Sequence, residues 1–295
     1  MICIRYDKHL YNTSNINWPI FIYIVFGHIF ALYAFYDLMF ILNRYLFVEL
    51  YLWHSITAFG ITAGMHRLWS HRSYKAKDPT RFLLMILASI SNQGSIYHWS
   101  RDHRIHHKHS DTVSDPHNIS NGFFYSHMGW LLLKKSNNVK NAGNNINCQD
   151  LMDDWIVKLN YQFNPLWNQF WCFIFPGLYG IWRFNSFYRG MLLFGILRWI
   201  IVLHCTWCVN SVAHTFGYRP YKNIRPTESL ITSFMAVGEG WHNWHHAYPF
   251  DYAASEYGIF YRWNPTKLLI DLLWLIGQTY DHKRVSIQKD TRLKL

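Results

Sequence analysis

The chain has 295 residues, of which 51% are hydrophobic and 19% aromatic, and it carries a formal net charge of +11. This apolar content exceeds that of soluble domains and predicts segments that lie in a lipid bilayer. The sequence shows no Arg- or Lys-rich helix and no aromatic RNA-binding strand, so the charge does not favour nucleic-acid binding. It favours acidic small molecules, anionic lipid and phosphate-bearing ligands.

Four apolar stretches predict membrane-spanning helices at about residues 18–42, 46–64, 170–184 and 190–209. The first and last are long enough for a hydrocarbon layer that takes roughly 20 residues of helix. The third is shorter and is interrupted by Pro176 and Gly177. Only a few residues separate the members of each pair, around Asn43 to Tyr45 in the first, so we predict two hairpins.

Two hairpins would place the two blocks of higher polarity, residues 65–169 and 210–295, on the same side of the membrane, where we expect them to form one cap. They hold 12 and 10 Lys and Arg residues, against three in the hairpin tips. The positive-inside rule therefore predicts a cytosolic cap and cytosolic N- and C-termini. The first stretch is too long for a signal-peptide core and is expected to remain as an anchor. Five cysteines without a CxxC pair predict neither a disulfide framework nor a zinc-thiolate site.

Nine of the 18 histidines fall in four tight groups within HRLWSH, RDHRIHH, NSVAH and EGWHNWHH. They are His66, His71, His103, His106, His107, His214, His242, His245 and His246. An HxxHH triplet on an α-helix projects three imidazoles from one face. The first and third groups follow the second and fourth apolar stretches, so all four are expected to meet where the helices enter the cap. One metal ion takes about four to six ligands, so nine imidazoles predict two metals.

A lone histidine is more often a surface or hydrogen-bonded core residue than a ligand. That interpretation applies to the other nine, of which His109 and His117, near the first triplet, are the best candidates for exceptions. The remaining seven are His9, His28, His54, His98, His127, His204 and His282. There is no HExxH motif of a zinc protease, and the ExxH motif of soluble di-iron bundles occurs once, at Glu239 and His242. Neutral imidazoles suit Fe(II), the metal of choice for oxygen activation.

The residues around these histidines resemble the acyl-CoA desaturases of animals and fungi, most closely the stearoyl-CoA desaturase type. The stretches that carry the resemblance are HRLWSHRSYKA (66–76), RDHRIHHKHSDT (101–112), DPHN (115–118), GFFYSHMGWLLLKK (122–135), NSVAHTFGYRPY (210–221) and GEGWHNWHHAYPFDYAASEYG (238–258). Sterol oxidases, alkane hydroxylases and fatty-acid hydroxylases share the histidine boxes but not these surrounding residues.

The resemblance implies an all-α integral membrane protein of the endoplasmic reticulum, with a single desaturase domain over residues 1–295. Four transmembrane helices in two hairpins would support a cytosolic helical cap that carries a histidine-ligated di-iron site. The implied reaction uses O2 and two electrons from cytochrome b5, with its reductase, to insert a double bond, by default Δ9, into a long-chain fatty acyl-CoA.

The resemblance also implies a role for each histidine of the four groups. One iron would be held by His66, His71, His103, His107 and His245. The other would be held by His106, His214, His242 and His246, with Asn210 holding a water on this second iron.

Substrate residues follow from the same resemblance. The bend of the acyl tunnel would lie at Gln93, Trp99 and Thr206, and CoA would meet Arg101, Asp102, Lys134 and Lys135. For the two lysines a solvated surface charge is the alternative. The closed end of the tunnel would lie at His54 and Ala58, since His54 precedes His66 by 12 residues, about 18 Å of helix.

The sequence departs from the family pattern at several of these places. Gly94, Ser95 and His98 replace polar or acidic residues near the CoA site, and Pro19 and Ile20 replace two polar residues before the first helix. His54 stands where a tyrosine is usual, so the preferred chain length is left open.

Two alternative functions remain. A lipid or fatty acyl hydroxylase would use the same iron scaffold, and a divalent-metal transporter is a remote alternative. Transporters need ligands near the membrane midplane, whereas these histidines lie at or beyond the ends of the apolar stretches.

Overall fold

The computed structural model describes residues 11–40 and 45–285. The described chain is mostly helical, with one small antiparallel sheet that pairs β1 (Lys75–Ala76) with β2 (Thr279–Tyr280). The sequence features that fall outside these residues are His9, Cys3, the last two residues of the first predicted span and the hairpin tip around Asn43 and Arg44.

Three helices among the described residues are long and apolar enough to cross a membrane. They are α1 (Trp18–Phe40), the helix Leu46–Ser70 that joins α2 (Leu46–Phe59) to the π-helical η2 (Gly60–Ser70), and the helix Phe187–Thr215 that joins α11 (Phe187–Gly190), η6 (Met191–Leu197) and α12 (Arg198–Thr215). The second and third of these continue beyond the apolar stretches predicted at 46–64 and 190–209. The reason is that η2 and the end of α12 are buried in the protein, where polar side chains can continue a helix without contacting lipid.

The stretch predicted as a third span, residues 170–184, is helical but shorter. It consists of η5 (Phe170–Ile174) and α10 (Phe175–Phe184), preceded by α9 (Leu166–Gln169). Pro176 lies in the first turn of α10, where the missing N–H costs little. Then α10 folds back on α11 at two glycines, since a Cβ on Gly180 would lie 2.4 Å from the Cα of Gly190. Four transmembrane helices therefore remain a prediction.

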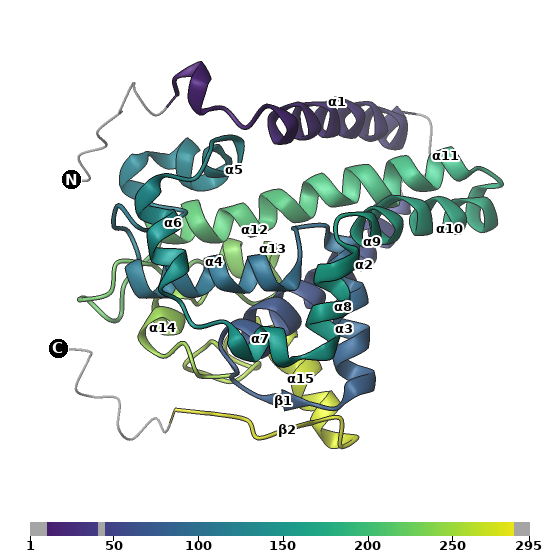
Figure 1. Ribbon diagram of the computed structural model, residues 1–295. Coiled ribbons are helices and arrows are strands. Elements are labelled where there is room, and N and C mark those ends of the chain that lie inside the picture. Colours follow the sequence, from purple (N-terminus) through teal and green to yellow (C-terminus); the bar gives the residue numbers. More distant parts are fainter. Residues whose placement is uncertain (1–10, 41–44, 286–295) are drawn as a thin grey trace.

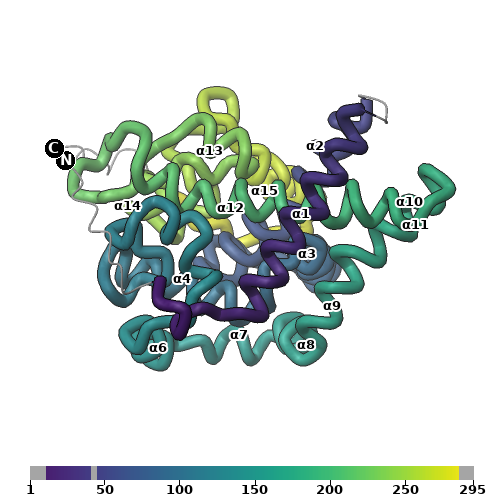
Figure 2. The backbone as a smooth tube through the Cα atoms, turned by 90° about the horizontal axis from the view of Figure 1, so that it is seen from above, coloured from purple at the N-terminus to yellow at the C-terminus, as the bar shows by residue number. Residues whose placement is uncertain are grey.

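Short helices make up the rest of the described chain. Before α10 these are η1 (Thr13–Asn15), α3 (Asp78–Ser91), α4 (Ile96–His109), η3 (Ile119–Asn121), η4 (Tyr125–Gly129), α5 (Trp130–Leu132), α6 (Asn137–Asn144), α7 (Gln149–Asp153) and α8 (Trp155–Phe163). After α12 they are α13 (Leu230–Met235), α14 (His242–Ala247) and α15 (Pro265–Leu275). In Figure 1 most of these helices lie beside and below α12, while α10 and α11 project to the right. Figure 2, seen from above, shows the same separation.

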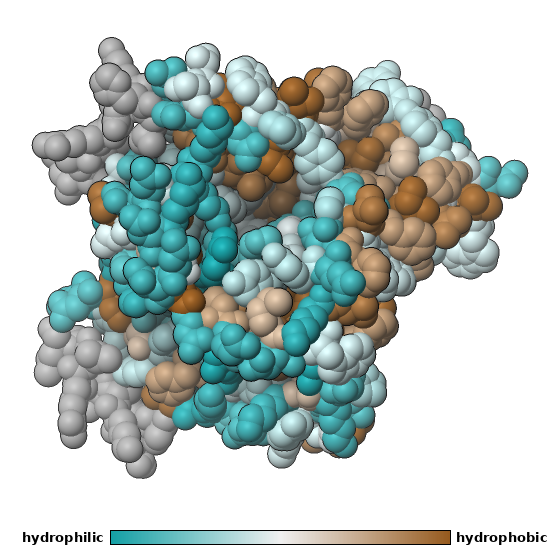
Figure 3. Space-filling model, viewed as in Figure 1, coloured by the Kyte–Doolittle hydropathy of each residue, from teal (hydrophilic) through white to brown (hydrophobic). Residues whose placement is uncertain are grey.

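Two buried clusters hold these parts together. One joins α1, α2 and η6–α12 through residues such as Ile24, Leu50 and Phe194. The other joins η2, α3, α4 and α8 through residues such as Met65 and Ile96. Figure 3 shows apolar side chains over α10 and the nearby end of α1, polar side chains over the short helices, and a hollow between α1 and α4.

Candidate metal centre

Four helical segments bring the nine grouped histidines together in two groups. His66 lies on η2 and His71 directly follows it, because this helix continues past the apolar stretch into the cap. His214 lies in the last turn of α12. The two HxxHH triplets lie on α4 and α14, so each presents its imidazoles from one helical face.

The first group contains five imidazoles, each of which offers one ring nitrogen within 4.8 Å of the others. Its members are His66, His71, His103, His107 and His245. The Nε2 atoms of His71 and His103 are 2.7 Å apart, and the Nε2 of His245 lies 2.9 Å from that of His66 and 3.0 Å from that of His107. Nitrogens that share one metal at about 2.1 Å must lie this close.

The second group contains four imidazoles with the same property: His106, His214, His242 and His246. The Nε2 of His242 lies 3.1 Å from that of His214 and 3.1 Å from that of His246. These two groups have the same membership as the two iron sites that the family resemblance implies.

Carboxylates fix the orientation of three of these rings. The Nδ1 of His66 lies 3.0 Å from Glu239, that of His106 2.9 Å from Asp115, and that of His214 3.2 Å from Asp111. A carboxylate accepts from Nδ1–H, so the lone pair stays on Nε2, which faces the metal group.

Sequence reasoning did not assign these three carboxylates. The ExxH pattern drew attention to Glu239 as a weak candidate ligand, but its oxygens belong to neither group. The Glu239 oxygens instead pair with the His66 ring and with the guanidinium of Arg67, whose Nη2 is 2.8 Å from Oε1. Asp111 and Asp115 could have been identified from their place in HSDTVSDP, directly after the first HxxHH triplet.

The electrostatics of the cluster favour neutral imidazoles. Burial, followed by the charge of neighbouring imidazoles, lowers the pKa well below its usual value at His71, His103, His107, His242, His245 and His246. Burial also lowers the pKa of His106, but the Asp115 carboxylate outweighs it and the net direction is upward. Burial would raise the pKa of Glu239, yet Arg67 and His66 lower it to about 2. Neutral rings held by ionised carboxylates are the form in which histidine binds metals.

The Nε2 atom of His106 indicates that a metal fits the second group. The Nε2 of His106 is buried and has no hydrogen-bond partner, while its Nδ1 is held by Asp115. A buried ring nitrogen without a hydrogen-bond partner lowers the stability of the folded protein, so such atoms are rare unless a ligand binds them. A metal in the second group would satisfy it, so the donor set fits a metal pair.

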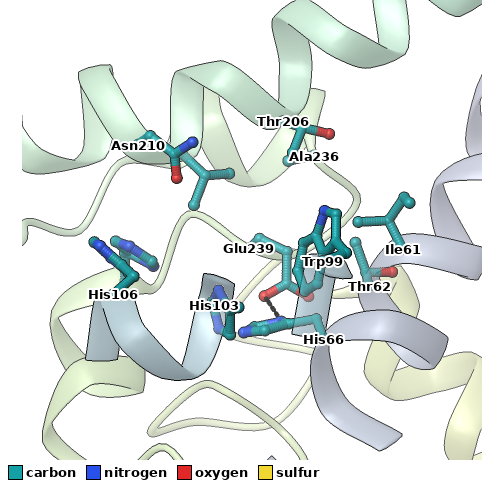
Figure 4. Close-up of a pocket in the computed structure, with 12 residues that line it drawn as sticks. Ile61, Thr62, His66, Trp99, His103, His106, Thr206, Asn210, Ala236 and Glu239 are labelled. Atoms are coloured by element: carbon teal, nitrogen blue, oxygen red, sulfur yellow. Dashed lines mark ion pairs between the residues drawn. The ribbon is translucent and has the colours of Figure 1, made fainter. Parts of the chain in front are cut away.

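A cavity opens directly onto both groups. It is lined by the histidines His66, His103, His106 and His242, and by Ile61, Thr62, Trp99, Thr206, Val209, Asn210, Ala236 and Glu239. Figure 4 shows Asn210 and Thr206 on the helix above the cavity, with Trp99, His103 and His66 below. Asn210 thus lies beside the second group, where the resemblance implies a metal-bound water.

The predicted tunnel bend forms one hydrogen-bonded unit. Gln93 donates through Nε2 to Thr206 Oγ1 at 2.8 Å, and Trp99 Nε1 donates to Gln93 Oε1 at 3.1 Å. Trp99 and Thr206 line the cavity, and Gln93 supports them from behind. His54 and Ala58 are buried on α2 but are not among the residues that line this cavity, and His54 Nε2 lies 2.9 Å from the carbonyl oxygen of Met235.

The residues expected to meet CoA divide into two sets. Asp102 receives Lys135 and Arg101, the latter at 3.3 Å, so these three lie together. Lys134 is separate, because its Nζ donates to the carbonyl oxygen of Ser14 at 3.0 Å. The segment before α1 is therefore attached to the end of α5.

The two suggested exceptions among the other histidines differ. His117 is buried, and its ring lies near His106 and Asp115. Burial lowers the pKa of His117 to about 3. His109 lies at the end of α4 and belongs to none of the groups found among the described residues.

Three histidines outside the metal groups form a hydrogen-bonded chain that joins α1, α12 and η4. His28 Nε2 lies 3.0 Å from His204 Nε2, and His204 Nδ1 lies 3.0 Å from His127 Nε2. The ends are the Ile24 carbonyl at 2.7 Å from His28 Nδ1 and the Ser211 hydroxyl at 2.9 Å from His127 Nδ1. A carbonyl can only accept, so in the neutral chain the N–H of each ring points toward Ile24. The Ser211 hydroxyl ends the chain, where its one hydrogen is shared between His127 Nδ1 and the Trp207 carbonyl oxygen at 2.9 Å.

Fold and site together define a helical protein with three apolar helices long enough to span a membrane and two imidazole groups, each able to hold a metal ion, beside an internal cavity. Comparison with known proteins then gives the family. Residues 45–269 match the family described as fatty acid desaturase, and the chain belongs to this family. The resemblance inferred from the sequence is confirmed.

Individual relatives agree with this assignment. The chain is 47% identical over 241 residues to stearoyl-CoA desaturase 2 of Rattus norvegicus, covering 80% of this chain and 66% of that protein. It is 47% identical over 239 residues to stearoyl-CoA desaturase of Homo sapiens, covering 79% and 65%. It is 43% identical over 263 residues to the Delta(9)-fatty-acid desaturase fat-7 of Caenorhabditis elegans, covering 88% and 77%. The aligned region thus spans about two thirds of the length of the two mammalian relatives.

Proposed function

We propose that this protein is a membrane-bound, O2-dependent desaturase that inserts a double bond, Δ9 by default, into a long-chain fatty acyl-CoA. The observation that carries the proposal is the pair of imidazole groups, five and four in number, that border one internal cavity. The names of the relatives, stearoyl-CoA desaturase and Delta(9)-fatty-acid desaturase, support the substrate and the reaction.

The nine histidines would hold two iron ions in the groups described above, with Asn210 holding a water beside the second. When bound, the iron pair supplies the oxidising power for removing two hydrogens from adjacent methylenes. Overall, one O2, two electrons, two protons and the two substrate hydrogens become two waters. We assign the electrons to cytochrome b5 and its reductase.

The protein's own residues prepare this site in two ways. The carboxylates of Glu239, Asp115 and Asp111 keep Nδ1 of His66, His106 and His214 protonated, so Nε2 is free to bind. Five of the nine histidines, His66, His106, His214, His242 and His245, are buried, which would help keep bulk water from the reacting carbons.

The cavity wall would position the acyl chain, which has no polar handle. Trp99 and Thr206 form the wall at the bend, and their link through Gln93 fixes both side chains. At the other end, the Lys135, Arg101 and Asp102 cluster would meet the CoA phosphates, because guanidinium and ammonium groups bind phosphate strongly. Lys134 would contribute through its exposed charge.

The membrane arrangement that accompanies this function has four spans in two hairpins and a cytosolic cap in the endoplasmic reticulum. Three apolar helices support it, and the helical hairpin α10–α11 supplies the turn of the second pair. A single domain would then comprise the whole chain, because η2 and α12 place histidines in the two groups that border one cavity.

Expression in desaturase-deficient yeast, followed by gas chromatography and mass spectrometry of derivatised lipids, tests the proposal. The wild type should yield a monounsaturated fatty acid, while His106→Ala and His245→Ala should yield none and His282→Ala should match the wild type. Purified active protein should contain two irons per chain. A hydroxylated product would replace the proposal by the hydroxylase alternative, and one metal or none in active protein would refute the two-iron site.

A further inference from the structure

A row of aromatic side chains runs along the protein from the end of α12 to the side of α2. We call it the aromatic belt: Phe123, Phe216, Tyr218, Tyr257, Trp263 and Phe234. Its members are joined by ring contacts and by Arg262. The rings of Phe123 and Phe216 lie 6.1 Å apart, and those of Trp263 and Phe234 lie 5.8 Å apart.

Arg262 joins the two halves of the belt. Its Nη2 donates to the Tyr218 hydroxyl at 2.9 Å, and its guanidinium carbon lies 5.4 Å from the ring centre of Tyr257. Trp263 is its neighbour in sequence. The belt thus consists of two ring pairs and two tyrosines held by Arg262, which short stretches of sequence join to one another.

Both ends of the belt lie against membrane-spanning helices. Phe216 directly follows α12, which ends at Thr215. At the other end Phe234 stacks on Tyr51 of α2 at 5.9 Å between ring centres, and Tyr51 belongs to the exposed apolar face of that helix. At its Phe234 end the belt thus continues the exposed apolar face of α2.

Apolar side chains beside the belt are far more exposed than water would favour. Phe260 is 94% and Tyr261 84% exposed on the loop before Trp263, and Ile231 is 72% and Leu230 64% exposed on α13. Adjacent large apolar side chains of this kind mark an interaction surface.

The polar groups around this surface are already paired within the protein. Ser229 caps α13 by accepting from the Thr232 N–H at 3.2 Å, and the Trp263 carbonyl accepts from Ser233 at 2.7 Å and from Trp241 at 3.1 Å. Arg262 also lies 3.4 Å from Glu228. Internal pairing of polar groups is what a surface in contact with lipid requires.

We propose that the aromatic belt, α13 and the Phe260–Tyr261 loop rest in the interfacial region of the bilayer. The partner is the lipid surface, because the Phe234 end of the belt meets the exposed apolar face of the spanning helix α2 and because aromatic rings collect at the boundary between head groups and acyl chains. This part of the cap therefore does not face the cytosol but dips into the membrane beside α2. The inference does not depend on which reaction the metal groups catalyse.

Fluorine NMR of the full-length protein in phosphatidylcholine nanodiscs tests this placement. Trifluoromethyl-phenylalanine replaces Phe260 in one sample and Ile231 in a second, so the result does not depend on one loop. The control carries the label at Val113, a 71% exposed apolar residue of the cap outside the belt. Each sample receives either lipid with a nitroxide on its acyl chain or a water-soluble gadolinium chelate.

Labels at 260 and 231 should be broadened by the nitroxide lipid and spared by the chelate, while the label at 113 shows the reverse. Broadening of all three labels by the chelate to the same degree would overturn the proposal. Protection of 260 and 231 from both reagents would overturn it too, because it would show that a second copy or another protein covers the surface.

Discussion

At the scale of single residues, the carboxylates behind the metal-facing imidazoles have the clearest effect. Asp115 is buried, holds His106 Nδ1 at 2.9 Å, and also accepts from the backbone N–H of Asp111 and His117. The neighbouring His106 lowers the pKa of Asp115 despite its burial, so the carboxylate is ionised when it holds the ring.

We therefore expect Asp115→Asn to weaken metal binding roughly 10- to 100-fold, the usual cost of losing a carboxylate behind a ligand histidine. The amide cannot accept with a full negative charge, and the His106 ring loses its fixed tautomer. Metal content after dialysis against graded chelator measures the effect. Asp153→Asn, at an exposed carboxylate bonded to Gln149, is the matched control, and equal metal retention in both variants would contradict the prediction.

The same residues explain what the sequence could and could not predict about the site. HxxHH spacing is local, and helix geometry converts it directly into three imidazoles on one face, so both triplets could be found. The contact of Glu239 with His66 depends on how the segment before α14 lies against η2, which no local pattern determines. Similarly, Asp102 pairs with Lys135 but not with Lys134, because Lys134 is occupied by the segment before α1.

At the scale of elements, α12 serves two purposes on opposite faces. Thr206, Val209 and Asn210 face the cavity, whereas His204 and Ser211 belong to the histidine chain that reaches α1 and η4. Through this histidine chain, the middle of α1 is hydrogen-bonded to α12.

His204→Phe should therefore lower the free energy of unfolding by about 1–3 kcal/mol, because it leaves ring nitrogens of both His28 and His127 without partners. His204→Gln should lose less, since its amide can still donate to His28. The apparent melting temperature in one detergent measures both. Ile29→Phe, on the exposed face of α1, controls for an added ring, and an unchanged melting temperature in His204→Phe would show that the chain adds no stability.

The element α2 carries a prediction about chain length. Ala58 and His54 lie one helical turn apart and are both buried, with Ala58 nearer the metal groups. If this face closes the acyl tunnel, Ala58→Leu fills its end and excludes longer acyl chains.

Competition between acyl-CoAs of graded length should then shift toward shorter substrates by about tenfold in Ala58→Leu. His54→Ala should shift the preference toward longer ones. Val48→Leu, at a 63% exposed position on the lipid-facing side of α2, should leave the profile unchanged. An active Ala58→Leu enzyme with the wild-type profile would remove this face from the tunnel wall.

At the scale of the whole molecule, hydropathy predicted the spanning helices better than their ends. An apolar run is visible in the sequence wherever lipid surrounds a helix, which is why α1, α2 and α12 were found. Helix Leu46–Ser70 passes the apolar limit at Gly64 because the cap buries its last turns, and burial depends on residues far away in the chain. The short helices of the cap have no long periodic pattern, so their number could not be predicted.

The distribution of charge over the whole molecule predicts on which side of the membrane the metal groups lie. The two polar blocks carry 22 of the 28 Lys and Arg residues, and they contain the short helices around the metal groups. The positive-inside rule therefore predicts that the cap is cytosolic, where CoA and the electron donor are available. A glycosylation acceptor sequence inserted near Asn141, an exposed position on α6, should stay unmodified in microsomes. As a positive control, the acceptor peptide alone is fused behind a cleavable secretion signal. Its glycosylation confirms that the microsomes can modify the acceptor sequence. Glycosylation at Asn141 would place the cap in the lumen and reverse the topology, and with it the access of acyl-CoA from the cytosol.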